Sequence, residues 1–415
     1  MTTSLLAPAA SPALAAGWPP SLQLLLGEAA VDLWSAALAP TGAGLRSLRA
    51  TSVTLQPDGA AIVQYAASLV TADGRPARDT LAATTGSRIP DGAAVLAGDV
   101  SGTTVEVGLW RWPHDPALPA LAWATSAAAV RARLPGLGVP AEDARLRLRA
   151  YRPGRRAVVE VTSARGTWYL KVVRPRAAAP LAERHAVLGS GAPVPPVLAG
   201  TPDGVLVLPG LPGTPMRALL AGDGAGLPDL AAVDAVLDAL PAAALDLPAP
   251  GRHAPGDALG RARGHAAVLG MVAPHLRPRL DRLCAALEGV DPGRHERVPV
   301  HGDLYEAQLL VTDGAVTGLL DVDTAGAGHR VDDWATLLAH LAVLEQLLPD
   351  PATVIRTRAA WTAELAGRWP DDALRARVAA VLLGLATGPF RVQQAGWPAR
   401  TEARLALAEA ALTGG

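Results

Sequence analysis

The pattern of hydrophobic and polar positions divides this chain into three parts. Up to about residue 135, apolar and polar residues alternate in short runs that end at turn residues such as Asp58-Gly59, which predicts a region rich in strands. Residues 136–208 continue with strand patterns and one helix pattern. Beyond them, apolar residues recur at intervals of three and four, which predicts helices. We therefore expect parts at residues 1–135, 136–208 and 209–415.

The first part reads as a small β-rich cap with helix candidates in Ser21–Leu38. It carries no recognisable site motif, so the plain interpretation is a structural cap or an interaction module. The alternative is that it moves with the following part and influences domain closure. The predicted strands are Leu48–Leu55, Ala60–Leu69, Asp79–Ala83 and Thr103–Trp112.

The second part begins after a short helix candidate, Ser126–Arg133, with a strand that has one basic face. Arg145–Tyr151 alternates arginine with apolar residues, and a Gly-containing basic turn with Arg155 and Arg156 leads into the strand Ala157–Val161. Glycine permits close approach of the backbone to a ligand, and the arginines add positive charge. The turn is either a loop that covers a phosphate or a hairpin tip with solvated arginines.

A third strand, Thr167–Val173, carries Lys171 near its end. Lys171 is the only lysine among 37 basic residues, so an ammonium group at this one position suggests a specific requirement. A helix predicted at Pro180–Leu188 contains Glu183. This acid either pairs with Lys171 or favours the start of the helix dipole. The apolar strand that follows ends at Val207 and Leu208.

The third part is mainly helical, with Pro and Gly between the helices. The predicted helices are Met216–Leu220, Leu230–Leu240, Asp257–Leu269, His275–Leu287, Asp332–Leu347, Ala352–Leu365, Asp372–Leu385 and Thr401–Leu412.

One stretch within this part concentrates chemistry. Asp313-Gly314 lies between two apolar runs, which predicts a two-residue hairpin turn. With that turn, Gln308 faces Leu319 and Asp321 faces Glu306, so Asp321 returns close to Gln308. Together with Asp303 of His301-Gly302-Asp303, this brings two carboxylates and an amide oxygen to one place. Hard oxygen ligands of this kind suit Mg²⁺ bound together with phosphates, and Asp303 is left to accept a proton from a hydroxyl.

This stretch resembles the catalytic loop and metal site of kinase-like small-molecule phosphotransferases, the aminoglycoside phosphotransferase and choline kinase group. Their pattern is His-x-Asp-x-x-x-x-Asn followed by an Asp after a short hairpin. The resemblance implies an α+β, eukaryotic protein kinase-like bilobal fold, with a β-rich N-lobe, a mainly helical C-lobe and here an extra β-rich cap. It also implies ATP and Mg²⁺, with Asp303 as catalytic base and Asp321 as main metal ligand, assisted by Gln308 and Asp323.

The same resemblance assigns the nucleotide contacts. Lys171 would contact the α- and β-phosphates, Glu183 would hold that lysine, and Arg155 and Arg156 would lie in the nucleotide loop. Backbone groups of the strand end at Val207–Leu208 would contact adenine. Asp333 would brace the catalytic loop or cap the next helix, so we treat it and Asp332 as structural.

The chain departs from the family pattern at Gln308, where most of the group has Asn. No Asn occurs anywhere in the chain. Gln offers the same oxygen on a side chain one methylene longer, so we expect metal binding with altered geometry. Gln at this position in a chain with a long N-terminal extension resembles the maltokinase branch and a bacterial glucosamine kinase group with the same cap.

The acceptor site is expected near the C-terminus and beside the catalytic loop. Gln393 and Gln394 could bridge sugar hydroxyls, and Trp397 could cover the apolar face of a sugar ring, although most tryptophans of the chain are expected in the core. Glu306 and Glu402 could bind the ammonium group of an amino sugar.

Composition limits the remaining possibilities. The net charge of −1 argues against nucleic acid or a membrane surface as main partner. The single cysteine, Cys284, permits a reducing compartment, and the first 27 residues lack the basic residues of a signal peptide. Pro, Gly and charge interrupt every long apolar run, which argues against a membrane span. We expect a cytoplasmic monomer or homodimer.

The leading hypothesis is ATP-dependent phosphorylation of a small sugar, with glucosamine converted to glucosamine 6-phosphate. The preference for glucosamine rests on the resemblance. The alternatives are a maltokinase that forms maltose 1-phosphate, another small-molecule kinase such as an aminoglycoside phosphotransferase, or a non-catalytic nucleotide-binding scaffold. A protein kinase is disfavoured because no Asp-Phe-Gly or activation-segment pattern follows Asp321.

Overall fold

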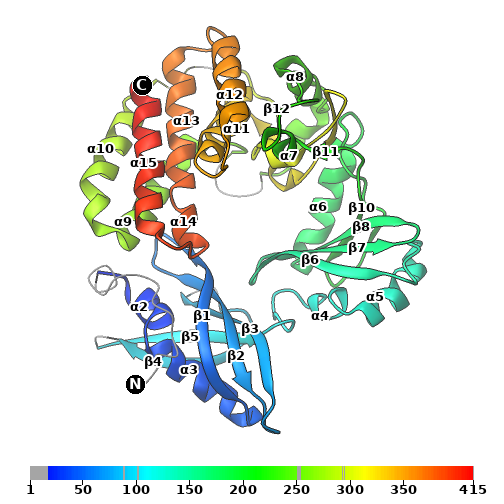
Figure 1. Cartoon of the computed structure of the whole chain (residues 1–415), viewed down its shortest axis with the longest axis vertical. Coiled ribbons are helices and arrows are strands. Elements are labelled where there is room, and N and C mark those ends of the chain that lie inside the picture. The colour runs from blue at the N-terminus through cyan, green and yellow to red at the C-terminus, as the bar shows by residue number, and fades with distance from the viewer. Residues whose placement is uncertain are drawn as a thin grey trace.

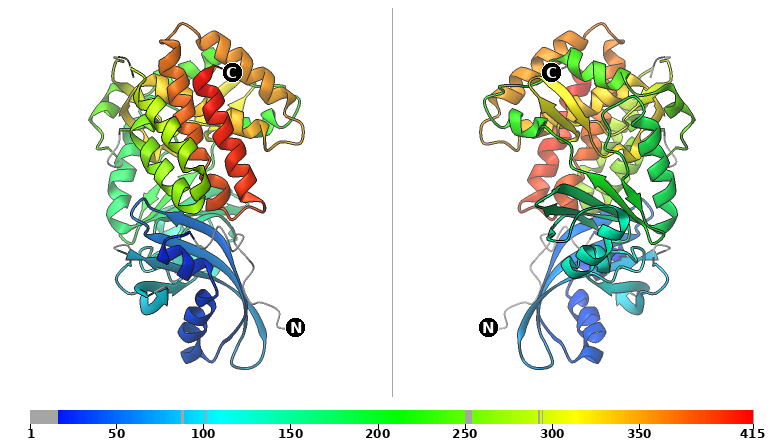
Figure 2. Two further views of the ribbon diagram at one scale, coloured as in Figure 1. Left: turned by 90° about the vertical axis from the view of Figure 1, so that its left-hand side faces the viewer. Right: turned by 90° about the vertical axis from the view of Figure 1, so that its right-hand side faces the viewer.

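A computed structural model describes residues 17–86, 89–100, 102–249, 254–291, 293 and 295–414 of the 415-residue chain. Figure 1 shows a β-rich N-terminal cap beneath the C-terminal helices, with a second sheet to one side of both. The two lateral views in Figure 2 also place the cap below the helices. The expected α+β fold, with a β-rich lobe and a helical lobe, is confirmed.

The cap is a five-stranded antiparallel sheet with two helices against it. The strand order is β1-β2-β3-β5-β4, so the four predicted strands are present and β4 was missed. Strand β4 lies at the exposed edge and is held by backbone pairing to β5, which leaves little hydrophobic pattern in its sequence. The elements are α2 (Pro20–Leu26), α3 (Ala29–Leu38), β1 (Gly44–Leu55), β2 (Ala61–Val70), β3 (Pro76–Thr85), β4 (Ala94–Val100) and β5 (Thr103–Arg111).

Aromatic residues bind the cap helices to the cap sheet and the cap to the helical lobe. Trp34 packs edge-on against Tyr65, with 6.0 Å between ring centroids, and the Tyr65 hydroxyl donates to the Leu25 carbonyl. The Trp18 indole N–H donates to the carbonyl of Val272 in the helical lobe at 3.0 Å. Because these buried residues form one continuous cluster, the cap shares a hydrophobic core with the helices above it.

The second sheet is the N-lobe expected from the kinase-like resemblance. Its antiparallel strand order is β6-β7-β8-β10-β9, and α6 follows β8. Helix α6 begins five residues earlier than predicted, because Pro175 occupies its first turn, where a missing N–H is harmless. The elements are α4 (Leu121–Ala124), α5 (Ala127–Arg133), β6 (Arg145–Arg152), β7 (Arg156–Ser163), β8 (Gly166–Val173), α6 (Pro175–Leu188), β9 (Ala199–Gly200) and β10 (Val205–Pro209).

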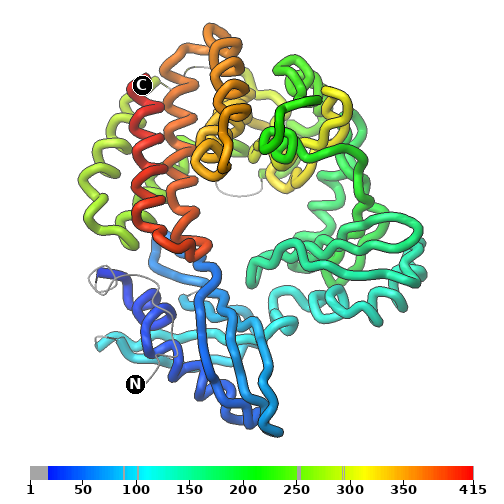
Figure 3. The backbone as a smooth tube through the Cα atoms, in the orientation of Figure 1, coloured from blue at the N-terminus to red at the C-terminus, as the bar shows by residue number. Residues whose placement is uncertain are grey.

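The helical lobe contains all eight predicted helices, with ends that differ by a few residues. The backbone trace in Figure 3 shows these helices grouped above the cap. They are α7 (Met216–Leu220), α8 (Leu230–Asp238), α9 (Ala258–Val272), α10 (Arg277–Glu288), α11 (Arg330–Glu345), α12 (Ala352–Leu365), α13 (Asp371–Leu385) and α15 (Trp397–Thr413), with a short α14 (Gly388–Arg391). Short strands β11 (Thr214–Pro215), β12 (Val298–Val300), β13 (Leu309–Thr312), β14 (Ala315–Leu319) and β15 (Gly326–Gly328) complete the lobe.

The predicted hairpin is present, but its register shifts by one residue. Asp313 and Gly314 both have positive φ, 49° and 79°, as a type I′ turn requires. The pairing follows the prediction up to Val311 opposite Val316, and then a bulge leaves Thr317 as an extra residue. As a consequence Leu320, rather than Leu319, donates its N–H to the Gln308 carbonyl at 2.8 Å.

Among the described residues, one helical stretch, Asp371–Arg391, is long and apolar enough to cross a membrane. Its mean hydropathy is 1.3, and 61% of its most apolar window is buried inside the protein. The stretch Pro20–Leu26 with Ala29–Thr41 passes the same test only as a pair bent by 64°. Such values are also found in core helices, and α13 packs against α9, α11 and α15.

We expect Trp34→Ala to lower the free energy of unfolding of the cap by about 3–5 kcal/mol, because the indole is buried and a cavity would remain. Thermal unfolding should show this as a lower midpoint. Val95→Ala, on an exposed position of the same sheet, serves as control and should change the midpoint little. Equal midpoints for the two variants would contradict the proposed packing of the cap.

Candidate active site

Five of the predicted site residues, two arginines and three acids, line a cleft of about 860 Å³ that both lobes form. Arg152, Arg155 and Arg156 approach it from the turn between β6 and β7, and the helical lobe contributes the acids. Gln56 of the cap also lines the cleft, so all three parts of the chain meet there. The acids are Asp303, Asp321 and Asp323.

The loop His301-Gly302-Asp303 is fixed from behind by Asp333. This carboxylate is fully buried on α11 and accepts the backbone N–H groups of His301 and Gly302, each at 2.8 Å. The structural role expected for Asp333 is confirmed. Gly302 has φ 78°, and a Cβ on it would lie 2.7 Å from the Thr324 carbonyl oxygen, so this position requires glycine.

His301 joins this loop to the returning strand. Its Nε2 lies 2.8 Å from the carbonyl oxygen of Leu320, the residue before Asp321. The His301 carbonyl in turn accepts from the Thr324 hydroxyl at 3.2 Å. These bonds set the spacing between Asp303 and the segment that carries Asp321 and Asp323.

Asp303 opens to solvent within the cleft, yet protein surrounds it closely. The partial loss of water around Asp303 raises the pKa of this carboxyl above its ordinary value. The negative charge of Asp321 raises the pKa further, whereas the charges of His301 and Arg156 lower it. A carboxylate with a raised pKa is a better proton acceptor than an ordinary aspartate. Asp303 is therefore suited to the predicted role of general base.

Two cations from the N-lobe neutralise the two acids of the C-lobe. Lys171 Nζ lies 3.0 Å from Asp321 Oδ1 and also binds Asp323. Arg156 contacts both oxygens of Asp321 at 3.0 Å and Asp323 Oδ2 at 2.8 Å. The lysine that is unique in the sequence is thus buried and pairs with two acids that line the cleft.

Asp321 has an unusual backbone conformation, with φ 53° and ψ 48° in the left-handed region. Such a conformation is costly for a residue other than glycine and marks a position held by its surroundings. Although burial opposes ionisation, the charges of Lys171 and Arg156 hold the pKa of Asp321 far below its usual range. Asp321 is therefore ionised at any working pH.

The donor set of the cleft suits Mg²⁺. Asp321 and Asp323 offer carboxylate oxygens, and the backbone carbonyl of Gln308 accepts the N–H of the residue before Asp321, so Gln308 lies beside this segment. Among the described residues, no group of three or more His, Cys, Asp or Glu side chains forms a metal cage.

Glu183 does not pair with Lys171. The buried face of α6 is formed by Ala178, Leu181, Arg184, His185 and Leu188, and Glu183 falls on the exposed face. The prediction was wrong because the helix begins earlier and is turned so that the next residue points inward. No local pattern in the sequence points to Arg184, whose guanidinium donates to the carbonyls of Asp323 and Ala325 and so holds the segment that follows Asp321.

Val207 and Leu208 lie inside the second sheet rather than at a free edge. The Val207 carbonyl accepts the N–H of Leu198 at 2.8 Å, and Leu208 pairs with Tyr169 of β8. The predicted adenine contacts through their backbones therefore do not fit, because strand pairing already uses these groups.

Glu306 and Gln308 lie directly after the catalytic loop and are almost fully buried. Glu306 Oε1 lies 3.3 Å from Arg217, whereas Oε2 has no hydrogen-bond partner within the described part of the chain. Burial raises the pKa of Glu306. Tyr305, between this acid and Asp303, stacks on His340 with 4.4 Å between ring centroids, a contact that the sequence did not reveal.

Trp397 is a core residue. Its side chain is 3% exposed and packs against Phe390 with 5.0 Å between ring centroids. The prediction that it covers a sugar ring was wrong, because the first turn of α15 directs the large indole into the core, where its burial is favourable.

The other three C-terminal residues also lie outside the described cleft lining. Gln393 donates to the Phe390 carbonyl at the end of α14, and Gln394 is half-buried beside it. Glu402 lies 3.0 Å from His275 Nε2, so α15 directs it toward the α9–α10 side. None of Gln393, Gln394 and Glu402 lines the cleft that Asp303 lines, and their part in an acceptor site stays a prediction.

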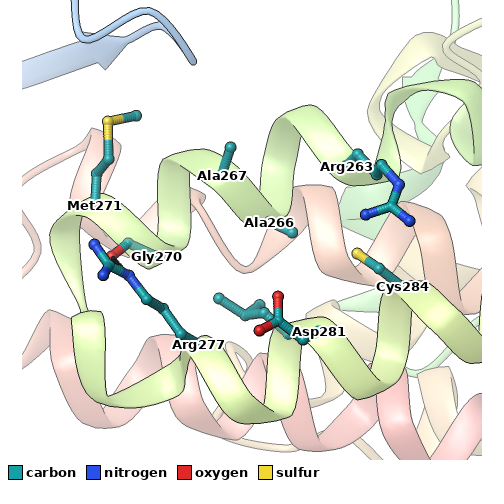
Figure 4. Close-up of a pocket in the computed structure, with 9 residues that line it drawn as sticks. Arg263, Ala266, Ala267, Gly270, Met271, Arg277, Asp281 and Cys284 are labelled. Atoms are coloured by element: carbon teal, nitrogen blue, oxygen red, sulfur yellow. Dashed lines mark hydrogen bonds between the residues drawn. The ribbon is translucent and has the colours of Figure 1, made fainter.

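A separate hollow of about 410 Å³ lies between α9 and α10 (Figure 4). Arg263 and Cys284 lie at one end of it, and Arg277 and Met271 lie toward the other. None of its lining residues belongs to the predicted site, so the catalytic chemistry stays with the cleft between the lobes.

Comparisons with known proteins find one matching family and several similar structures. Residues 147–369 match the family model described as the phosphotransferase enzyme family. Among solved structures, macrolide 2′-phosphotransferase MphH from Brachybacterium faecium is similar, with 25% identity, 64% of this chain and 91% of that chain covered, and a TM-score of 0.39. Aminoglycoside phosphotransferase APH(4)-Ia is similar with 14% identity, coverage of 69% and 99%, and a TM-score of 0.50. No curated protein matches the chain significantly.

We expect Asp333→Ala to loosen the catalytic loop, because two buried backbone N–H groups would lose their acceptor at a cost of about 1–3 kcal/mol each. Hydrogen exchange of a peptide that covers residues 300–304 should accelerate. Asp350→Ala, which removes an exposed aspartate from the Ala352 N–H, is the matched control and should leave that peptide unchanged. Unaltered exchange in Asp333→Ala would show that another group holds the loop.

Proposed function

This chain belongs to the phosphotransferase enzyme family, and on that basis we propose that it transfers the γ-phosphoryl group of ATP to a hydroxyl group of a small sugar. The observation that carries the proposal is that Asp303 and Asp321 line one cleft and that the buried Lys171 pairs with Asp321. A base, a phosphate-binding cation and a metal-binding acid are the groups that phosphoryl transfer to an alcohol requires.

The cations of the cleft would bind the phosphates of ATP. Lys171 and Arg156 now neutralise Asp321 and Asp323, and the phosphate oxygens would take over these two cations. The carboxylates would then be free for Mg²⁺, with Gln308 as a further oxygen donor. When bound, the metal ion neutralises charge on the β- and γ-phosphates.

Asp303 would orient the acceptor hydroxyl and take its proton. The hydroxyl oxygen forms a bond to the γ-phosphorus as the bond from that phosphorus to the β,γ-bridging oxygen breaks, and ADP leaves. Most of the rate would come from positioning and charge neutralisation, because the protein forms no covalent bond in this reaction. The brace from Asp333 and the link through His301 would hold Asp303 in place.

We propose glucosamine as the acceptor, phosphorylated at its 6-hydroxyl. What supports this choice is Glu306, a buried acid three residues after Asp303 whose Oε2 has no hydrogen-bond partner among the described residues. An ammonium group that reached this oxygen would pair it. Maltose and an aminoglycoside are the alternative acceptors. Maltose has no ammonium group and would leave this oxygen unpaired.

The acceptor is tested by measuring ADP release with Mg-ATP and, in parallel, glucosamine, maltose, glucose and an aminoglycoside. We expect turnover with glucosamine, and Glu306→Gln should raise the KM for glucosamine while it leaves the KM for ATP unchanged. Turnover with maltose alone would move the protein to the maltokinase alternative. ATP binding without turnover on any acceptor would favour a non-catalytic scaffold.

We expect Asp303→Asn to lower kcat by about 10²–10⁴-fold, the usual contribution of a general base, without weakening nucleotide binding. Lys171→Ala should instead act on ATP, raising its KM by roughly 10–100-fold through loss of a charge-assisted contact. Steady-state kinetics and direct titration with ADP separate the two effects. Full turnover by Asp303→Asn would exclude Asp303 as the base.

The raised pKa of Asp303 gives a pH prediction. The base works only when deprotonated, so kcat should fall as the pH decreases through its pKa, and the fall should begin above the ordinary aspartate value of about 3.9. The pH–rate profile of the wild-type protein, measured where thermal unfolding shows it folded, checks this. An acid limb at or below the ordinary value would contradict the environment described for Asp303.

A further inference from the structure

A buried carboxylate, Asp115, joins the cap to the turn that carries the cleft arginines. It lies between the cap sheet and the N-lobe and is 2% exposed. Its Oδ2 accepts the backbone N–H of Gly154 at 2.7 Å and the hydroxyl of Tyr151 at 2.9 Å. Its Oδ1 accepts the N–H of Ala117 at 3.0 Å, so both oxygens are used. A buried carboxylate with three donors is held firmly and fixes what it binds.

Gly154 is fixed on both sides. Its N–H binds Asp115, and its carbonyl accepts from Arg174 Nε at 2.8 Å. The residue has φ 67°, in the left-handed region that favours glycine. Gly154 and Pro153 are buried, whereas the arginines of the same turn face the cleft.

The hydrogen bonds of Gly154 determine which groups of the turn remain available to bind a phosphate. In many nucleotide-binding loops, backbone N–H groups point at the phosphate oxygens. Here the N–H of Gly154 points away from the cleft toward Asp115. The turn therefore presents the side chains of Arg152, Arg155 and Arg156 to the cleft instead.

A chain of contacts continues from Asp115 into the cap. The Tyr151 hydroxyl that donates to Asp115 accepts from the Trp110 indole N–H at 3.1 Å. Trp112 packs on the Tyr151 ring with 4.7 Å between centroids. Trp110 belongs to β5 of the cap sheet, and Trp18 anchors the same cap to α9 of the C-lobe. The cap thus contacts the phosphate-facing turn at one end and the helical lobe at the other.

We propose that Asp115 is a positioning residue for the phosphoryl donor: through Gly154 it holds the cleft arginines over the phosphates, and through Tyr151 and Trp110 it makes that position depend on the cap. The identity of the donor rests on the proposed function. The cap then acts in nucleotide use although it contains no catalytic group. The hydrogen bonds from Trp110 through Tyr151 and Asp115 to Gly154, rather than a sequence motif, connect the cap to the reaction.

The test compares Asp115→Ala with Asp115→Asn. In Asp115→Ala we expect the KM for Mg-ATP to rise by about tenfold or more, while kcat at saturating ATP and the KM for the acceptor change less than threefold. Asp115→Asn keeps one oxygen acceptor and should recover part of the loss. A purely structural role would instead lower kcat with the folded fraction and leave the KM for ATP unchanged, and that result would overturn the proposal.

Two further variants test the connection to the cap. Trp110→Phe removes the indole donor, which does not line the cleft, and should raise the KM for Mg-ATP by about two- to fivefold. In combination with Tyr151→Phe the effects should not add, because both act through Asp115. Asp79→Ala is the matched control: it breaks the ion pair with Arg111 on the same sheet without touching Tyr151. An equal effect of Asp79→Ala would show that general loosening of the cap is the cause.

Hydrogen exchange separates failure of this proposal from failure of the proposed function. A peptide that covers residues 152–156 should exchange faster in Asp115→Ala than in wild type without any nucleotide present. If the wild-type protein binds neither ATP nor ADP but the exchange difference is seen, ATP is not the phosphoryl donor, and Asp115 still holds the turn at residues 152–156. If nucleotide binds and exchange is unchanged, Asp115 does not position the turn.

Discussion

The charge balance across the cleft is the interaction on which the rest of the structure depends. Asp321 and Asp323 of the helical lobe would repel each other, and Lys171 and Arg156 of the N-lobe compensate them. Removing either partner would leave a partly buried charge unpaired, which is strongly unfavourable. The same four groups keep the two lobes in contact and form the centre of the proposed phosphate and metal site. The protein is thus held together, in part, by the groups that its substrates would engage.

Two buried carboxylates accept backbone N–H groups and so fix the segments that carry the cleft residues. Asp333 binds two N–H groups of the catalytic loop, and Asp115 binds one in the turn between β6 and β7. Both carboxylates are buried and neither faces the cleft, so each acts through the segment that it holds. Fixed segments keep reacting groups close to productive geometry, which is the largest contribution available to a phosphoryl-transfer enzyme. In this fold the cap takes part in that anchoring, since Tyr151 and Trp110 connect it to Asp115.

The acceptor side differs from the donor side. Tyr305 and Glu306 follow Asp303 closely in sequence, and Tyr305 stacks on His340. Trp397 instead packs against Phe390 in the core, and Glu402 contacts His275. Of the residues expected to bind the acceptor, Glu306 therefore lies next to the catalytic loop in sequence, whereas Trp397 and Glu402 have other partners. The proposed choice of glucosamine depends accordingly on Glu306.

The sequence alone determined the elements whose signals are local. The Asp313-Gly314 turn, the helices of the C-lobe and the loop His301-Gly302-Asp303 follow from residue types at short spacing. The unique Lys171 pointed to a position that pairs with an acid of the cleft. Only the tertiary structure decided what depends on long-range packing. The bulge at Thr317, the turned face of α6 that leaves Glu183 in solvent, the burial of Trp397 and the reach of Asp115 to Gly154 are of this kind. A local pattern states which face of an element is apolar, but the partner that this face meets is fixed by segments far away in the chain.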